Sequence, residues 1–142
     1  MTDSAKTRPV FTNIHVTQIV SYRLPPAGIV SILHRISGVV MFLLLPFVVW
    51  MLDNSLSSEI SFEAFTNVFV AGAAGIPGWF VKLVALGLIW AYLHHFIAGV
   101  RHLWMDATHS VSKAQGHSSA VITLALSVLL TVALGAKLFG LY

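Results

Sequence analysis

The chain contains three stretches of apolar residues, each long enough to cross a lipid bilayer. They cover about residues 29 to 52, 79 to 105 and 118 to 142. The hydrocarbon core of a bilayer is about 30 Å thick and requires roughly 20 apolar residues per helix. Because no water is available there, backbone polar groups must pair within the span, which a helix does by itself. The sequence therefore predicts an all-α integral membrane protein with three transmembrane helices, in which residues 1 to 142 form a single transmembrane domain.

Composition excludes several classes of protein and site. With 57% hydrophobic and 9% charged residues, the chain is not an ordinary soluble domain. It has no cysteine, which excludes disulfides, an iron–sulfur ligand set and a thiolate zinc site. The net charge of +3 is carried by scattered basic residues, so nucleic-acid binding has no support. A bound metal would need nitrogen or oxygen ligands, and the seven histidines are the main source of nitrogen.

The segments around the first span have their own patterns. Residues 1 to 28 are polar and proline-containing, without the features of a removable signal peptide. Pro46 lies inside the first apolar run and should kink it. Residues 53 to 78 should form a loop, in which apolar residues at helical spacing predict a short helix on the membrane surface, namely Phe62, Phe65, Val68 and Phe69.

Basic residues indicate the orientation of the chain. The N-terminal segment carries Lys6, Arg8 and Arg23, the first loop has no basic residue, and the second loop has Lys113. By the positive-inside rule, residues 1 to 28 and the second loop are cytoplasmic, and the C-terminus is periplasmic. The start of the first span and the end of the second therefore lie on the same side of the membrane. Their polar residues should converge at one depth.

The segment HHFIAGVRHLWMD, residues 94 to 106, places ionisable groups in the second span. His95, Gly99 and His102 follow each other at i, i+4 and i+7 and form one stripe of a helix, while His94 and Arg101 project in neighbouring directions. Ionisable side chains within a span are costly and usually face the protein interior or a cofactor. For Arg101 and Asp106, near the membrane edge, snorkelling toward headgroups or pairing with each other is an equally good interpretation.

A deep histidine in a chain without thiols suits haem iron, because neutral imidazole is a common axial donor. Gly99, one turn from His95, leaves room for a flat macrocycle along the helix. His95 and His102 cannot bind the same iron, since they lie about 10 Å apart along one side of the helix. A second axial ligand must come from another helix or another chain.

The first span has a matching polar stripe. Ser31, Arg35 and Gly38 recur at i, i+4 and i+7, and His34 lies beside them. The arginine and serine could hold haem propionates by charge-assisted hydrogen bonds, or a quinone carbonyl by neutral ones. Alternatively, Arg35 only marks the cytoplasmic end of the helix. Three further histidines lie in polar segments, face solvent and receive no role, namely His15, His109 and His117.

Four segments taken together resemble one known family. They are RPV at residues 8 to 10, SILHRISGV at 31 to 39, SLSS followed by FEAF in the first loop, and HHFIAGVRHLWMD. In a three-span protein this combination resembles the cytochrome b membrane-anchor subunit of bacterial succinate dehydrogenase, also called succinate:ubiquinone oxidoreductase or complex II. The resemblance covers nearly the whole chain.

The resemblance implies a function that spacing alone does not. Such subunits lie in the bacterial inner membrane and, with a second small hydrophobic subunit, anchor a flavoprotein and an iron–sulfur subunit. Electrons from succinate reach ubiquinone near the cytoplasmic surface, which links the citric acid cycle to aerobic respiratory electron transport. Haem b lies between the two anchor subunits, with one axial histidine from each.

The family motif H-x-x-x-G-x-R-H assigns the haem-iron ligand to His95. His94 directly precedes it, and the helical stripe with Gly99 favours His95. The resemblance also assigns Ser31 and Arg35 to the ubiquinone pocket, and His34, Arg35 and His102 to the haem propionates or the haem environment.

No segment resembles a flavin-binding fold or a dicarboxylate site, so we expect no succinate chemistry and no catalytic residue on this chain itself. It would act as a membrane subunit of the oxidoreductase. Two alternatives stay open: a haem-free structural anchor, and the equivalent subunit of a fumarate reductase.

Overall fold

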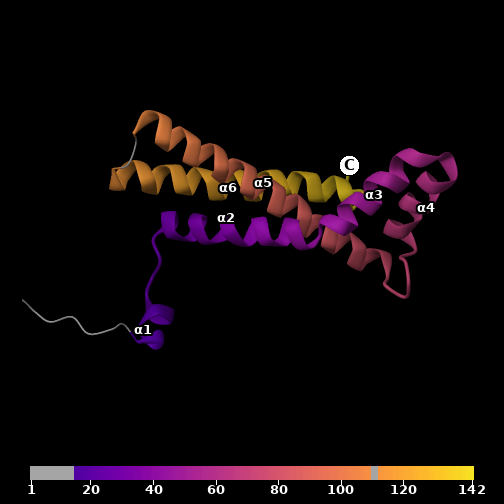
Figure 1. The fold of residues 1–142 in the computed structure, drawn as a ribbon, viewed down its shortest axis with the longest axis horizontal. Helices are drawn as coiled ribbons and strands as arrows, with labels where there is room; N and C mark the ends of the chain where they lie inside the picture. Colours follow the sequence, from indigo (N-terminus) through magenta and orange to yellow (C-terminus); the bar gives the residue numbers. More distant parts are fainter. Residues whose placement is uncertain (1–14, 110–111) are drawn as a thin grey trace, which may run out of the picture.

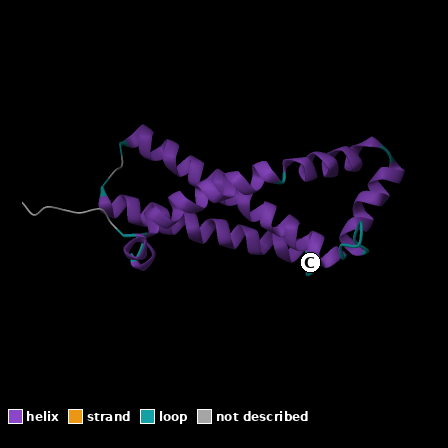
Figure 2. Ribbon diagram, turned by 60° about the horizontal axis from the view of Figure 1, so that its bottom comes forward, coloured by secondary structure: helices purple, strands orange, loops and turns teal. Residues whose placement is uncertain are grey.

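The computed structural model describes residues 15–109 and 112–142, which are almost entirely helical (Figures 1 and 2). The helices are α1 (Val16–Ser21), α2 (Pro26–Leu43), α3 (Leu45–Ser57), α4 (Glu59–Val70), α5 (Gly78–Thr108) and α6 (Lys113–Leu138). The only β-type pairing among these residues is an isolated bridge between Ala73 and Ile76. The all-α prediction is confirmed for the described part of the chain. The RPV motif and Lys6 lie outside it.

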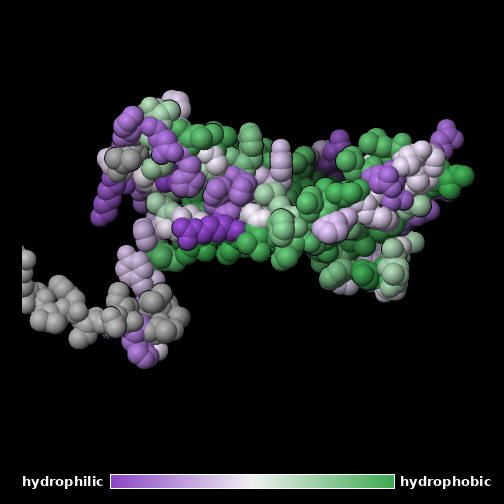
Figure 3. Space-filling view, viewed as in Figure 1, coloured by the Kyte–Doolittle hydropathy of each residue, from purple (hydrophilic) through white to green (hydrophobic). Residues whose placement is uncertain are grey.

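Three helices, α2, α5 and α6, form a bundle in which each contacts the other two. All three are long and apolar enough to cross a membrane. Large apolar side chains remain exposed along their outer faces, as expected where lipid is the solvent. In Figure 3, hydrophilic residues gather at the end of the bundle that holds the start of α2 and the α5–α6 turn. The predicted number of spans is therefore confirmed.

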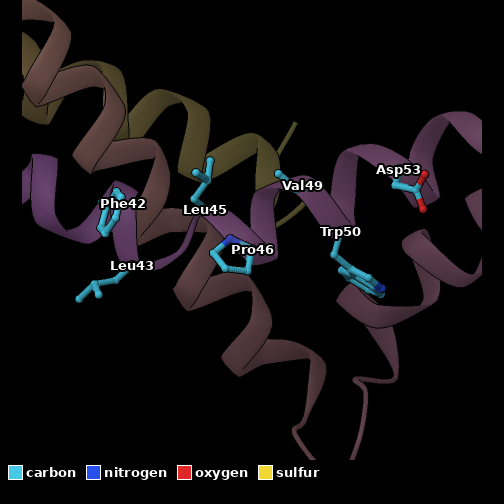
Figure 4. Close-up of a pocket in the computed structure, with 7 residues that line it drawn as sticks. All are labelled: Phe42, Leu43, Leu45, Pro46, Val49, Trp50 and Asp53. Atoms are coloured by element: carbon cyan, nitrogen blue, oxygen red, sulfur yellow. The ribbon is translucent and has the colours of Figure 1, made fainter.

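The first span ends earlier than its hydropathy predicts. We expected one kinked helix to about residue 52, but α2 ends at Leu43 and α3 starts at Leu45. Pro46 has no N–H for the carbonyl of Phe42, and its ring would collide with that carbonyl in a continuous helix. The chain therefore breaks at Leu44, and an apolar groove of about 820 Å³ lies along the break (Figure 4).

Beyond the break, α3 and α4 pack together and α4 contacts α5. The short helix predicted from the phenylalanine spacing is present as α4. Two reciprocal hydrogen bonds fix its start. The Ser58 hydroxyl accepts from the Ser61 N–H at 3.1 Å, and the Ser61 hydroxyl accepts from the Ser58 N–H. The turn into α5 needs Gly72, at φ 93°, because a Cβ there would lie 1.9 Å from the Ile76 carbonyl oxygen.

Small residues bring the bundle helices close together. Val30 of α2, Ala98 of α5 and Ala120 of α6 are fully buried and form one cluster. Short side chains let helix backbones approach, which favours packing in a bilayer where the hydrophobic effect does not drive association. This cluster lies one turn from His94 and His95, so it fixes the spacing of the helices that carry the polar stripes.

Candidate functional site

Three histidines from two helices meet in the α2–α5 interface. The ring of His34 stacks on His95 with centroids 4.1 Å apart, and it lies 5.4 Å from the ring of His102. The beginning of α2 and the last turns of α5 therefore lie at one depth, as the positions of their polar residues predicted. The stripe of His95, Gly99 and His102 faces α2.

Hydrogen bonds fix the tautomer and the direction of the neutral His95 ring. Its Nδ1 lies 3.0 Å from the backbone carbonyl oxygen of His34. A carbonyl can only accept, so in the neutral imidazole Nδ1 carries the hydrogen and Nε2 keeps its lone pair. The buried Ser37 hydroxyl donates to the same carbonyl at 2.8 Å and lies 3.3 Å from Nδ1. A histidine held this way through Nδ1 has the arrangement typical of a metal-ligating imidazole.

The donor set fits a haem better than a bare ion. Among residues 15–109 and 112–142, no group of three His, Cys, Asp or Glu side chains is arranged to hold a metal ion. His34 and His95 stack face to face, so their nitrogens cannot converge on one ion. Haem iron needs only an axial donor from the protein, because the macrocycle supplies the equatorial nitrogens. One imidazole with a free Nε2 meets that requirement.

Glycines give the imidazoles room. A Cβ on Gly38 would lie 3.1 Å from Cε1 of His95, so a larger residue there would push the ring aside. A Cβ on Gly99 would lie 3.9 Å from Nε2 of His34, an ordinary van der Waals contact. Within the chain, Gly38 is therefore the tighter constraint on His95, although the sequence pattern had drawn attention to Gly99.

His94 and Arg101 face α6 instead. His94 is fully buried, stacks on Trp90 and places Nδ1 3.2 Å from the Ser127 hydroxyl. Its Nε2 is buried without a hydrogen-bond partner in the described part of the chain. Arg101 is 8% exposed and donates from Nε to the Ser119 hydroxyl at 2.9 Å.

A second bond from Arg101 runs from Nη2 to the Gly116 carbonyl at 3.2 Å. The guanidinium therefore joins α5 to α6. Asp106 is exposed, and the structure has no ion pair between Arg101 and Asp106. The Arg101 side chain also does not extend toward the lipid headgroups, because it is buried between α5 and α6.

Ser31 and Arg35 lie on α2, one turn apart, beside His34. Arg35 is exposed and Ser31 is half-buried. Neither side chain makes a hydrogen bond or ion pair within the described residues. Both are therefore free to bind a group outside this chain.

Sequence reasoning missed Ser37, Ser119 and Ser127. Ser37 follows His34 by three residues in SILHRISGV, so its place on the same helix face was detectable. Ser119 and Ser127 are 18 and 33 residues from their partners on α5. Nothing local in the sequence indicates those two pairings.

Comparison with known proteins agrees with this architecture. Residues 5–134 match the family model for the succinate dehydrogenase/fumarate reductase transmembrane subunit. The succinate dehydrogenase cytochrome b556 subunit of Coxiella burnetii is 34% identical over 128 residues, covering 90% of this chain and 94% of that protein. The protein of the same name from Paracoccus denitrificans is 31% identical over 125 residues, covering 88% and 87%.

The family match covers most of the chain, and both relatives align over nearly their whole length. Three apolar helices and this bacterial family make the chain a multi-pass protein of the inner membrane. Its relatives are subunits of an enzyme complex, so it works as a membrane subunit with other chains. The chain belongs to the succinate dehydrogenase/fumarate reductase transmembrane-subunit family, as a cytochrome b membrane-anchor subunit of succinate dehydrogenase.

Proposed function

We propose that this chain binds haem b through Nε2 of His95 and forms part of the site at which succinate dehydrogenase reduces ubiquinone. The observation that carries the haem assignment is the bond between Nδ1 of His95 and the His34 carbonyl, which leaves Nε2 with its lone pair. The name cytochrome b556 of the relatives supports haem b as the cofactor. When bound, the haem supplies one-electron redox chemistry.

His94 is the competing ligand, and its surroundings argue against it. The ring is fully buried between α5 and α6, stacked on Trp90 and bonded to Ser127. A macrocycle could reach its Nε2 only by separating the helices. His95 is half-buried in the α2–α5 interface and needs no such rearrangement.

The second axial ligand comes from the partner anchor subunit in this proposal. His34 and His102 lie next to His95 on the same side of α5 and form the haem environment. The exposed guanidinium of Arg35, one residue from His34, is suited to a haem propionate because its charge has no partner in the described chain.

Ser31 and Arg35 form this chain's share of the ubiquinone site. A quinone carbonyl accepts hydrogen bonds, and a serine hydroxyl and an arginine guanidinium can donate them. Both residues lie in the first three turns of α2, near the end of the bundle. A quinone bound there would lie near the membrane surface, where a soluble iron–sulfur subunit can deliver electrons.

Anchoring completes the proposed role. In this proposal residues 1 to 28 and the α5–α6 turn face the cytoplasm, the C-terminus faces the periplasm, and the flavoprotein and iron–sulfur subunits dock on the cytoplasmic face. The histidine end of the bundle would then lie next to them. Residues 1 to 142 act as one transmembrane domain beside the second small hydrophobic subunit.

Two measurements on the complex purified through this subunit test the function. First, a reduced-minus-oxidised visible spectrum should contain a b-type band. A complex that retains its soluble subunits but has no such band would leave the haem-free anchor as the correct function. A preference for fumarate reduction with a low-potential quinol in the same preparation would instead favour the fumarate reductase alternative.

Second, Arg35→Ala should lower succinate-to-ubiquinone turnover by at least about tenfold, since it removes hydrogen bonds from a charged donor. Succinate oxidation by a water-soluble dye should be unchanged, because that reaction bypasses the quinone. Arg35→Lys is the matched variant that keeps the charge and should retain part of the turnover. Normal quinone reduction in Arg35→Ala would remove this residue from the site.

A further inference from the structure

At the end of the bundle opposite the histidines, a cavity of about 690 Å³ lies among α2, α3, α4, α5 and α6. Each of these helices contributes apolar side chains, including Met41, Val48, Phe65, Leu88 and Leu134. Its volume is in the range of small-molecule binding sites, about 300 to 1,000 Å³. In Figure 1 this region is where the α3–α4 pair meets the start of α5 and the end of α6. The cavity exists because the chain breaks at Leu44 and α3 leaves the line of α2.

An occupant of this cavity gains dispersion contacts with the side chains around it. The occupant must also be apolar. The polar groups in the lining are the hydroxyls of Ser55 and Tyr92, and the Ser55 hydroxyl already donates to the Leu52 carbonyl at 2.8 Å. A quinone head would leave at least one carbonyl without a donor there, whereas a hydrocarbon chain needs none.

The size of the cavity argues against a helix of a partner subunit. A helix about 10 Å across fills roughly 400 Å³ per turn, so the cavity would hold less than two turns. A transmembrane helix crosses the membrane with about 20 residues and could not be accommodated. A flexible acyl chain can bend into such a volume.

Two lysines at the same end of the bundle indicate the headgroup. Lys82 lies one turn before Ala85 on the cavity face of α5, and Lys137 directly precedes Leu138 on α6; both Ala85 and Leu138 line the cavity. The Lys82 ammonium lies 5.7 Å from the centre of the Phe139 ring. Neither lysine forms an ion pair within the described residues.

We propose that the cavity binds an acyl chain of an anionic phospholipid, whose phosphate headgroup is held by Lys82 and Lys137. The cavity accounts for the chain and the lysines account for the charge. Lys82 lies about 20 Å from His95 along α5, at 13 residues of 1.5 Å each, and the cavity lining reaches Leu93 without including any of the proposed haem and quinone residues. The bound lipid would fill the space left by the break at Leu44 and join the α3–α4 pair to the bundle.

The test uses the whole complex, reconstituted into nanodiscs with phospholipids that carry a photoreactive group on one acyl chain. Phosphatidylglycerol and phosphatidylcholine with the same chain are compared, and the cross-linked peptides are identified by mass spectrometry. We expect phosphatidylglycerol to label α4 and the Leu88–Tyr92 part of α5 more strongly than phosphatidylcholine does. Exposed residues of α6 such as Leu126 and Leu129 should show no such preference.

Variants separate the two halves of the proposal. Combining Lys82→Gln with Lys137→Gln should reduce the preference for phosphatidylglycerol by about fivefold for each lysine. The matched control, Lys113→Gln at the other end of α6, should leave it unchanged. Ala85→Leu narrows the cavity and should reduce labelling by both lipids, with assembly checked by retention of the soluble subunits.

Three results would overturn the proposal. The first is equal labelling of the cavity and of the exposed α6 face without headgroup preference. The second is a preference for phosphatidylglycerol that survives loss of both lysines. The third is an unlabelled cavity whose residues cross-link to another subunit, which would make a partner chain the occupant.

Discussion

His94 and His95 are adjacent in the chain and lie in two different interfaces. His95 faces α2, where the His34 carbonyl fixes its Nδ1 and leaves Nε2 available. His94 faces α6, where it is fully buried against Trp90 and Ser127. Successive residues of a helix point about 100° apart, so one helix can present one histidine to each neighbour. The α2–α5 interface is built to expose a nitrogen, and the α5–α6 interface is built to hold two helices together.

The same division applies about two turns further along α5. His102 lies near His34 in the α2–α5 interface, whereas Arg101 bonds to Ser119 and Gly116 across the α5–α6 interface. Arg101 and His94 thus join α5 to α6 at two depths, seven residues apart. Two such joints restrict rotation of α5 about its axis. They thereby keep the His95 stripe directed at α2.

The largest expected effect is on haem content. His95→Ala should abolish the b-type band of the purified complex, because it removes the Nε2 whose lone pair the bond from Nδ1 to the His34 carbonyl leaves available. His94→Leu should retain it, since His94 bonds Ser127 of α6 and takes no part in the stacked pair of His34 and His95. Haem is measured per flavin by the pyridine haemochrome method. Retention of full haem content in His95→Ala would refute the assignment.

The next effect is on stability of the α5–α6 interface. Arg101→Ala removes two hydrogen bonds from a buried charged group and should cost about 3 kcal/mol. The expected result is a lower midpoint of thermal unfolding. The midpoint is measured in detergent by circular dichroism. Arg23→Ala is the matched control, because that guanidinium is exposed, has no proposed binding role and should leave the midpoint nearly unchanged. Equal midpoints for wild type and Arg101→Ala would mean that the joint contributes little.

A smaller effect is expected at Gly38. A Cβ at 3.1 Å from Cε1 of His95 must displace the ring by a few tenths of an ångström. Gly38→Ala should therefore shift the low-spin haem signal in electron paramagnetic resonance while most of the haem stays bound. Gly87→Ala serves as the control, because a Cβ there meets nothing within 4 Å. Identical signals in both variants would show that the ring has more freedom than the contact implies.

The smallest effect is expected at Ser37. Ser37→Ala removes the hydroxyl that shares the His34 carbonyl with His95. One neutral hydrogen bond contributes about 1 kcal/mol, so haem should dissociate about fivefold faster, as measured by transfer to an excess of apomyoglobin. Ser118→Ala, an exposed serine of α6, provides the reference. If haem dissociates from Ser37→Ala and Ser118→Ala at the same rate, the His34 carbonyl alone holds the His95 ring in place.

Much of this arrangement could be predicted from the sequence. The three spans follow from hydropathy, and the stripe of His95 and His102 follows from helical spacing. The predicted end of the first span was wrong. The residues after Pro46 remain apolar to Leu52, and hydropathy does not report a backbone break. The pairing of α2 with the end of α5 was predicted from the orientation of the spans, since both polar stripes lie near the same surface.

The partners of Arg101 and His94 could not be predicted. Their directions depend on how α5 is rotated between two neighbouring helices, and the serines they bond lie on α6, far along the chain. Spacing within one helix gives the relative directions of His94 and His95, but not which neighbour each one meets. The roles of His95, Ser31 and Arg35 in binding stay predictions.

The most direct test of the division between the two interfaces is rescue by free imidazole. His95→Ala and His94→Ala complexes are purified with and without imidazole, and the low-spin haem spectrum is recorded. We predict that His95→Ala lacks the spectrum, that imidazole restores it by occupying the space of the lost ring, and that His94→Ala has it without addition. Loss and rescue in His94→Ala, with a normal spectrum in His95→Ala, would contradict the account.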